Sequence, residues 1–121
     1  MTDDRRWRIR LASTAEEDFR NILRWTEERF GEAQARIYAD TLTRAIQALS
    51  FGPNVAGTRP RNDVADGLMA LHVARGGRRG RHLVLYRVGS PSDPPVIDVL
   101  RLLHDSMDLP RHIPPLEQDD P

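Results

Sequence analysis

Two apolar stripes of helical spacing, separated by a short break at Gly31, constrain the fold of this chain more than any other feature. Ser13-Thr14-Ala15-Glu16 has the form of a capping box, which predicts that the first helix starts there. We expect Gly31 to end this helix, because glycine tolerates a left-handed C-cap. The first stripe consists of Ala15, Phe19, Ile22, Leu23, Thr26 and Phe30. The second consists of Ile37, Tyr38, Leu42, Ala45, Ile46 and Leu49. So short a break predicts an antiparallel helical hairpin.

The other patterned segments predict strands. Trp7, Ile9 and Leu11 alternate with arginines, which is typical of a half-buried strand. Further strands are expected near residues 68–74, 82–88 and 96–103, and residues 51–66 are expected to be a loop because Gly and Pro interrupt them. The stripes of the hairpin must bury against these strands. We therefore predict an α+β fold of order β-α-α-β-β-β, with the helical hairpin on one face of a small antiparallel sheet and the other face free, concave and polar.

Length and composition narrow the class of protein. The 121 residues fit one domain, which we place at residues 1–113, with a disordered acidic tail at 114–121. The chain has no Cys, which excludes disulfides and thiolate metal sites, and all 18 of its Lys and Arg residues are Arg, which excludes a Lys nucleophile. No apolar run is long enough for a signal peptide or a membrane span. We expect a soluble cytoplasmic protein.

Positive charge is concentrated in one part of the chain, although its formal net charge is 0. The segment from Gly67 to Ser92 has no acidic residue, and its arginines are Arg75, Arg78, Arg79, Arg81 and Arg87. Such a surface suits an anionic partner, either nucleic acid or an acidic protein segment. The alternative is a solvated hairpin tip whose charge only aids solubility. The glycines at positions 76, 77 and 80 lack the spacing of a phosphate-binding loop, so nucleotide binding is not indicated.

Several other side chains allow two interpretations. Tyr86 is either a stacking platform or general base, or a packed strand residue with its hydroxyl at the rim. Arg87 and Arg101 either share a binding face or form ion pairs, for example with Asp98. Trp25 lies beside the main stripe of its helix, and it either contacts a partner or covers the hairpin's edge against the N-terminal strand.

The histidines also allow more than one interpretation, including metal binding. His104 is either a proton carrier or a hydrogen-bonded residue at a strand end. His72 and His82 are expected to be surface strand residues and not ligands. The spacing of His104 and Asp108 is helical, but no third ligand lies nearby, so we predict neither a metal nor a cofactor.

The order of these elements, together with residues 82–88 and 100–112, resembles the RelE/ParE toxin superfamily, and more closely its ParE branch of plasmid-stabilisation toxins. Residues 28–35 are similar to the junction between the family's two helices. His104, Met107 and Asp108 resemble its terminal His-x-x-Met-Asp motif. The resemblance extends from Ile9 to about Ile113 and implies the family's α+β fold.

The resemblance also implies a function. ParE-type members poison DNA gyrase without catalysis, RelE-type members cut messenger RNA in the ribosome, and an antitoxin silences both. We therefore expect a gyrase inhibitor in a hetero-oligomer with a ParD-like, DNA-binding antitoxin. The candidate binding residues are Arg75, Arg78, Arg79, Arg81, Arg87, Arg101 and His104.

Two alternatives remain open at this point. The first is an mRNA endonuclease that uses Arg81, Arg87, Arg101 and His104. Against it, Leu83 occupies the place where the RelE branch tends to carry an Arg three residues before the strand Tyr. The second is a decayed toxin that only binds its antitoxin.

Overall fold

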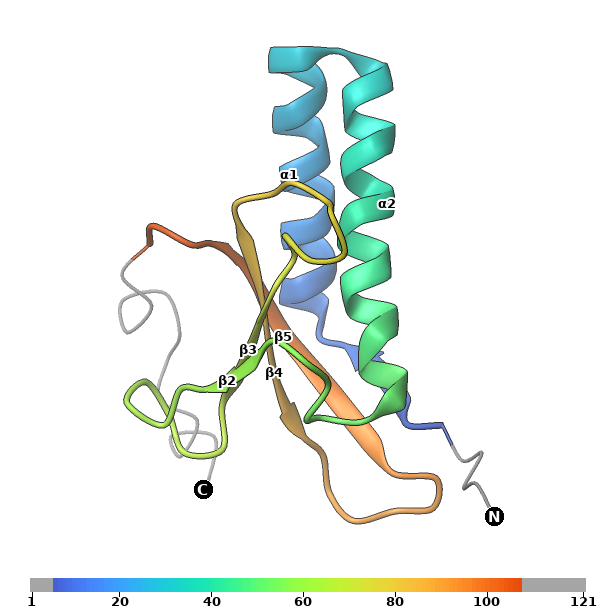
Figure 1. Cartoon of the computed structure of the whole chain (residues 1–121), viewed down its shortest axis with the longest axis vertical. Helices are drawn as coiled ribbons and strands as arrows, with labels where there is room; N and C mark the ends of the chain where they lie inside the picture. Colours follow the sequence, from blue (N-terminus) through green and yellow to red (C-terminus); the bar gives the residue numbers. More distant parts are fainter. Residues whose placement is uncertain (1–5, 108–121) are drawn as a thin grey trace.

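The computed structural model describes residues 6–107 and has two layers, a helical hairpin and a sheet (Figure 1). The helices are α1 (Ser13–Phe30) and α2 (Glu32–Ala48), followed by a 3₁₀ turn, η1 (Leu49–Phe51). The strands are β1 (Arg8–Leu11), β2 (Thr58–Pro60), β3 (Met69–His72), β4 (His82–Val88) and β5 (Val96–His104). They form one five-stranded sheet of order β1-β5-β4-β3-β2. The predicted α+β class is confirmed.

The helical hairpin turns at a single residue. Gly31 has φ +93° and donates its N–H to the Glu27 carbonyl, while its own carbonyl accepts the N–H of Ala35. It therefore ends one helix and begins the next, as its position in the sequence indicated. The predicted capping box at the start of α1 is wrong. Ala12 is the N-cap, and the Thr14 hydroxyl donates to the Leu100 carbonyl of β5 at 3.1 Å. A partner distant in sequence replaces the local one.

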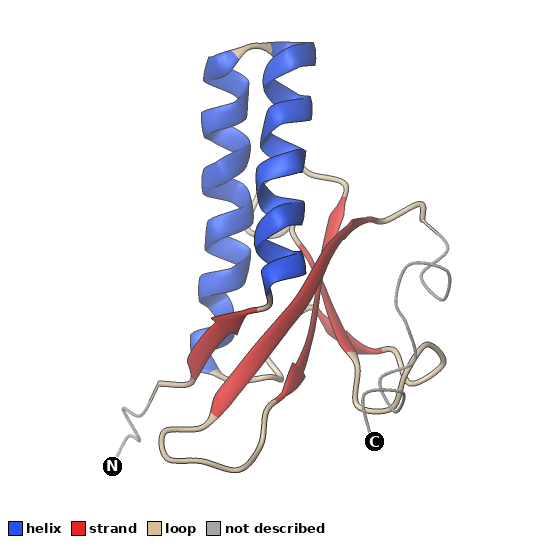
Figure 2. Ribbon diagram, turned by 180° about the vertical axis from the view of Figure 1, so that it is seen from behind, coloured by secondary structure: helices blue, strands red, loops and turns tan. Residues whose placement is uncertain are grey.

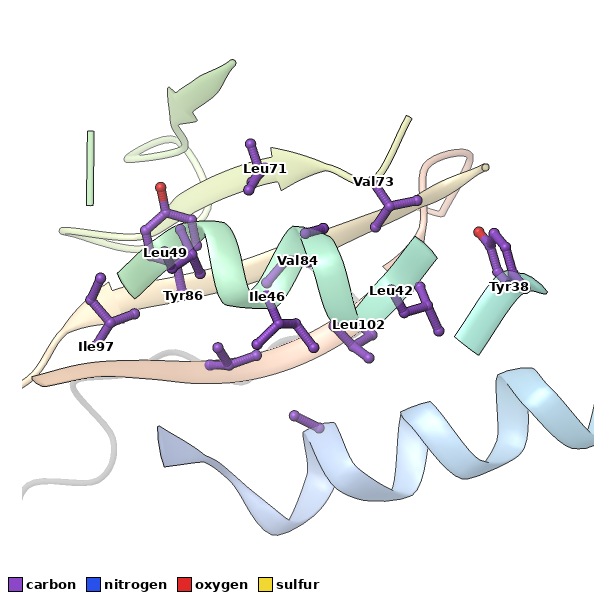
Figure 3. Close-up of a cluster of buried hydrophobic side chains, with 13 residues drawn as sticks. Tyr38, Leu42, Ile46, Leu49, Leu71, Val73, Val84, Tyr86, Ile97 and Leu102 are labelled. Atoms are coloured by element: carbon purple, nitrogen blue, oxygen red, sulfur yellow. The ribbon is translucent and has the colours of Figure 1, made fainter. Parts of the chain in front are cut away.

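The main core lies between the base of the helical hairpin and the sheet. Leu42 and Ile46 of α2 and Leu49 of η1 pack over Val84 and Tyr86 of β4 (Figure 3). Each of these side chains is at most 8% exposed. Most of the predicted helical stripe is therefore confirmed.

Two members of the predicted stripes are not in the core. Phe30 and Ile37 are 64% and 55% exposed. Both lie near the tip of the hairpin, where the helices extend past the strands (Figure 2). Within residues 6–107, no strand extends there to cover them.

The sheet differs from the prediction in two respects. First, β1 pairs parallel to β5, whereas the other neighbours pair antiparallel, so the sheet is mixed and not purely antiparallel. Alternation along β1 predicts a strand but does not say which strand it joins. Second, the predicted loop at 51–66 contains β2, which pairs with β3 at the edge of the sheet. Proline at Pro60 is compatible with an edge strand, because no ladder partner needs its missing N–H.

The face of the sheet away from the helices is apolar, contrary to the prediction of a free polar surface. Successive residues of β4 point to opposite faces, and Leu85 belongs to a second cluster that does not include Val84 or Tyr86. The buried members of this second cluster are Ala65, Leu68, Ala70, Leu85 and Leu103. Ala65 and Leu68 come from the segment after β2, which covers this face of the sheet. A second small core therefore occupies the place expected for a functional face.

Two further predictions concern the limits of the chain. Among the residues described, no helix is long and apolar enough to cross a membrane. The predicted tail at 114–121 and the last part of the predicted domain lie outside residues 6–107.

Candidate functional site

A groove of about 590 Å³ opens between the upper part of the helical hairpin and the adjacent ends of β4 and β5, and we call it the hairpin groove. Its lining residues come from α1, the hairpin tip, α2, the β3–β4 loop and both strands. They are Trp25, Thr26, Phe30, Gln34, Tyr38, Ala74, Arg78, Arg79, Gly80, Arg81, His82 and His104. None of these lining residues, all within the described part of the chain, is acidic.

A second depression of about 480 Å³ continues the groove along α1 and the last residues of β5, and we call it the β5 hollow. Trp25, His82 and His104 line both depressions. The remaining lining residues are Asp18, Asn21, Ile22, Arg101, Leu102, Leu103, Ser106 and Met107. The two depressions therefore form one extended surface with Trp25 at its middle.

The wall of the hairpin groove on the α1 side is aromatic. The rings of Trp25 and Phe30 meet edge to face with centroids 5.9 Å apart, and the Arg29 guanidinium lies 5.1 Å above the Trp25 ring. Half of the Trp25 surface is exposed, at 50%. Trp25 lines both depressions beside His82 and His104, at the ends of β4 and β5, and this place favours the partner-contact interpretation.

A hydrogen-bonded tyrosine joins α2 to β4 at the bottom of the groove. The Tyr38 hydroxyl accepts the Arg81 backbone N–H at 3.1 Å and lies 2.6 Å from His82 Nδ1. Through these two contacts the Tyr38 hydroxyl joins α2 to the start of β4. Gly80 makes this approach possible, because a Cβ there would come within 2.9 Å of the Tyr38 ring.

The two histidines of the groove are neighbours across the β4–β5 ladder. His82 and His104 are register partners, and their ring centroids are 5.3 Å apart. Burial, and after it the nearby His104, lower the pKa of His82 to about 4. His104 Nδ1 lies 2.7 Å from the Ser106 hydroxyl, so His104 is hydrogen-bonded at its strand end. His72 and His82 lie in strands, as predicted, but both are partly buried and hydrogen-bonded, His72 to Asp105 at 2.9 Å.

Two of the three arginines in the groove are paired with carboxylates of the same chain. Arg78 donates to Asp40 at 2.5 Å and to the Thr41 hydroxyl at 2.9 Å. Arg81 donates to Asp105 at 3.1 Å, and this contact, followed by that of His72, holds the Asp105 pKa well below its usual range.

Arg79 is different. It is exposed, and within residues 6–107 its side chain has no hydrogen bond or ion pair. The charge of Arg79 is therefore available to a partner.

Three of the candidate arginines lie outside the hairpin groove. Arg75 donates to the Ala56 carbonyl at 3.1 Å. Arg87 sits near the opposite end of β4, across from Asp98, whose carboxylate binds Arg10 at 2.8 Å. Arg101 lines the β5 hollow.

A carboxylate of α1 holds Arg101 in place. Asp18 accepts from the Arg101 guanidinium at 2.8 Å and from the Leu102 N–H at 2.9 Å. The predicted surface of unbalanced positive charge is therefore wrong in part. Asp40 and Asp105 lie outside the arginine-rich segment in sequence, and folding brings them to Arg78 and Arg81. Asp18 is brought in the same way to Arg101 of β5.

Tyr86 is fully buried, and its hydroxyl donates to the Pro53 carbonyl at 2.7 Å. Tyr86 therefore packs in the core, which is the second of the two interpretations given from the sequence.

Among residues 6–107, no cluster of three or more His, Cys, Asp or Glu side chains could hold a metal ion. The sequence drew attention to the arginines and Trp25, but it gave no signal for the contribution of Phe30 and Tyr38 to the groove.

Comparison with known structures supports the fold. A YoeB/ParE toxin from Agrobacterium tumefaciens superimposes with a TM-score of 0.53 at 14% sequence identity, and it covers 80% of this chain and 96% of its own. The RelBE2 toxin–antitoxin complex from Mycobacterium tuberculosis gives a TM-score of 0.50 at 21% identity, with 86% and 97% covered.

Comparison of sequences identifies the family. Toxin ParE1 of Caulobacter vibrioides is 30% identical over 104 residues, which are 86% of this chain and 95% of that protein. Toxin ParE of Escherichia coli is 32% identical over 99 residues, covering 82% and 85%. Residues 9–109 match the family model described as the ParE toxin of the type II toxin–antitoxin system parDE. The chain therefore belongs to the ParE family of type II toxins.

Proposed function

We propose that this chain is a cytoplasmic toxin that inhibits DNA gyrase by binding to it, without a chemical step, and that a cognate antitoxin neutralises it. Membership of the ParE family supports the target and the antitoxin. The position of the arginines supports binding over catalysis, and it is the observation on which this choice depends.

RNA cleavage needs a base, an acid and fixed cations around one phosphate. The four residues of the nuclease alternative do not converge in that way. Arg81 and His104 line the hairpin groove, whereas Arg87 is five residues further along β4 than His82, a distance of roughly 17 Å. Arg81 and Arg101 also hold carboxylates of the same chain.

One observation favours the nuclease alternative. The ring centroids of His82 and His104 are 5.3 Å apart, and Arg79 lines the same groove. Two histidines that could act as acid and base therefore lie in the same groove as a cation. The Tyr38 hydroxyl occupies His82 Nδ1, however, and the low pKa of His82 makes it a weak base. We therefore retain RNA cleavage as a second candidate.

The deciding experiment measures both activities with one purified protein. The chain is added to DNA gyrase with relaxed plasmid and ATP, and separately to ribosomes translating a defined mRNA. We expect loss of supercoiling with the mRNA intact. Cleavage of the mRNA at the ribosomal A-site, with normal supercoiling, would replace the proposal by the nuclease alternative.

The antitoxin part of the proposal is tested by co-expression. The chain is expressed alone and then with the protein encoded by the adjacent reading frame. We expect growth arrest with an SOS response in the first case and growth in the second. Harmless expression of the chain alone would favour a decayed toxin.

A further inference from the structure

We propose that three arginines on the face of the sheet away from the helices bind the phosphate backbone of double-helical DNA. They are Arg8, Arg10 and Arg87, and we call them the arginine row. The row lies toward the β1 edge of the sheet and lines neither the hairpin groove nor the β5 hollow. The choice of DNA rests on the proposed function, because gyrase acts on duplex DNA. The inference adds a second binding surface and its chemistry.

The register of three neighbouring strands forms the row. Arg10 of β1 and Arg87 of β4 are both register partners of Asp98 in β5, so these three side chains lie in one line across the sheet. Arg8 lies two residues before Arg10 and therefore on the same face of β1. Ile9, which alternates with them, packs against the main core, so the row points away from the helices. The second small core draws its members from β3, β4, β5 and the segment after β2, and it leaves the β1 side of this face to the row.

An ion pair at the centre of the row fixes Arg10 without covering it. The Asp98 carboxylate accepts from Arg10 Nε at 2.8 Å and from Nη2 at 3.1 Å. The Arg10 side chain remains 61% exposed, whereas that of Asp98 is 22% exposed. Gly89 leaves room for the pair, since a Cβ there would lie 3.0 Å from Asp98 Oδ2 and 3.5 Å from Arg10 Nη2. The outer surface of the row is therefore mainly guanidinium.

The row has positive charge left for a partner. Among residues 6–107, the side chains of Arg8 and Arg87 have no hydrogen bond or ion pair. The loop between β4 and β5 adds one carboxylate, Asp93, and the residue before Trp7 adds Arg6, which stacks on the Phe51 ring at 4.4 Å. The formal net charge of the chain is 0, so attraction to a polyanion must come from a local excess of this kind.

The spacing of the row suits phosphates. Positions two residues apart on a strand are roughly 6.6 Å apart, and positions two strands apart are roughly 9.6 Å apart. Phosphates two and three nucleotides apart on one DNA strand are separated by about 7 and 10 Å along the duplex axis. Each guanidinium also offers a fork of donors that matches phosphate oxygens. The row therefore fits a short stretch of one DNA strand.

Other classes of partner find fewer contacts on this face. Val88 is the exposed apolar residue next to Arg87, but it points to the opposite face, and protein interfaces depend on an apolar anchor. Within the described strands β1, β4 and β5, no aromatic ring points to the face of the row, so the bases of a single strand have nothing to stack on. A duplex backbone, read by charge and not by base sequence, is the partner that this chemistry favours.

The test measures binding of the chain to a fluorescein-labelled DNA duplex of about 20 base pairs, by fluorescence anisotropy between about 50 and 200 mM NaCl. Three phosphate contacts predict that log K falls with log salt concentration at a slope of about −2.7. Each of Arg8→Ala, Arg10→Ala and Arg87→Ala should reduce that slope by about 0.9 and raise Kd roughly 3- to 10-fold, equally for duplexes of different sequence. Lysine at the same positions keeps the charge and should retain most of the binding.

Matched variants carry the same change of charge elsewhere. Arg36→Ala removes a 73% exposed arginine of α2 and should leave Kd within about 2-fold. Asp98→Asn removes the carboxylate at the centre of the row and should lower Kd roughly 3-fold. Asp63→Asn, whose carboxylate binds Arg61 beyond the opposite edge strand, should not lower it. Circular dichroism melts check that every variant is folded.

Several outcomes would overturn the inference. They are equal Kd for the row variants and the unaltered chain, no binding by the unaltered chain at about 50 mM NaCl, and tighter binding of an RNA duplex or of single-stranded DNA. Row variants that aggregate, while their soluble fraction binds DNA unchanged, would assign the arginines to protection of an edge strand and would also overturn it.

The supercoiling assay decides the proposed function separately. Inhibition of gyrase by the unaltered chain, with DNA binding that the row variants retain, would remove only the inference. Loss of DNA binding in the row variants, with no inhibition of gyrase by the unaltered chain, would remove only the proposed function.

Discussion

The base and the tip of the helical hairpin carry similar apolar patterns but have opposite surroundings. At the base, Leu42 and Leu49 are fully buried against the sheet. At the tip, Trp25, Phe30 and Ile37 are each at least half exposed. Both regions belong to the same helical hairpin, joined at Gly31, and to the 3₁₀ turn that follows it.

The difference comes from the length of the layers. The 18 residues of α1 extend roughly 27 Å, and the strands support only part of that length (Figure 1). An apolar stripe therefore stabilises the fold where a sheet covers it and becomes an exposed contact surface where the sheet ends. The comparison predicts that substitutions at the base alter stability and that substitutions at the tip alter binding.

The largest effect is expected at the base. Leu42→Ala removes a fully buried side chain between α2 and the sheet, and the cavity should lower the free energy of unfolding by about 3 kcal/mol. Urea denaturation followed by circular dichroism measures the change. A loss below about 1 kcal/mol would mean that the base is not the main source of stability.

The free energy of unfolding should depend on pH through His82, which lies between the base and the tip of the hairpin. In the unfolded chain His82 regains its ordinary pKa of 6.5, whereas the folded chain resists protonation down to about 4. Between these values the unfolded state binds more protons, so stability falls as the pH drops. The loss should be on the order of 1–2 kcal/mol, since His82 is only partly buried.

His82→Asn is the control for this prediction, because the Asn amide can still hydrogen-bond to the Tyr38 hydroxyl but does not titrate. Urea midpoints from pH 7 to pH 4.5 should fall more steeply for the original chain than for the variant. The weakening of the Asp105 contacts belongs to a lower pH range, because the Asp105 pKa lies below its usual 3.8. Equal slopes for the two proteins would contradict the assignment to His82.

A smaller loss is expected from Tyr38→Phe. The ring stays in the core, but the Arg81 N–H and His82 Nδ1 lose their partner. An unsatisfied polar group at a half-buried site costs about 1 kcal/mol, so the free energy of unfolding should fall by about 1–2 kcal/mol. Thermal melts measure it, and Tyr86→Phe offers a comparison, since it also loses one hydroxyl bond. An unchanged melting temperature would show that the Tyr38 hydroxyl does not join α2 to β4 in solution.

The smallest effect on stability is expected at the tip. Trp25→Ala removes a half-exposed ring that contacts Phe30 and Arg29, and stability should change by less than about 1 kcal/mol. The same urea experiment as for Leu42→Ala measures it. A loss as large as that of Leu42→Ala would abolish the distinction between base and tip.

Much of the fold could be predicted because it depends on local patterns. Helical spacing indicated the buried face of α2, and Gly31 indicated the turn, since only a residue that accepts a positive φ fits there. Strand partners could not be predicted in this way. The parallel pairing of β1 with β5 and the edge strand β2 depend on contacts between distant segments.

The candidate site was predicted less well for the same reason. A run of arginines without an acid suggested free charge, yet Arg78 pairs with Asp40 of α2 and Arg81 pairs with Asp105 just after β5. Arg101 of β5 pairs with Asp18 of α1. The residues of these ion pairs are far apart in the sequence, so no local pattern indicates that they pair. Trp25 could be singled out by its residue type and its place beside the stripe. The loop after β3 forms part of the groove that Trp25 borders. No local sequence pattern predicts the position of that loop.

The single-residue link at Gly31 has a consequence for the kinetics and thermodynamics of association. A turn of one residue leaves the two helices little freedom to splay, so the aromatic tip is rigid before any partner arrives. A segment that folds on this tip would then carry nearly the whole conformational entropy loss itself. Its affinity should follow its own helix propensity, and its residence time should lengthen with each substitution that favours the helix in the unbound segment.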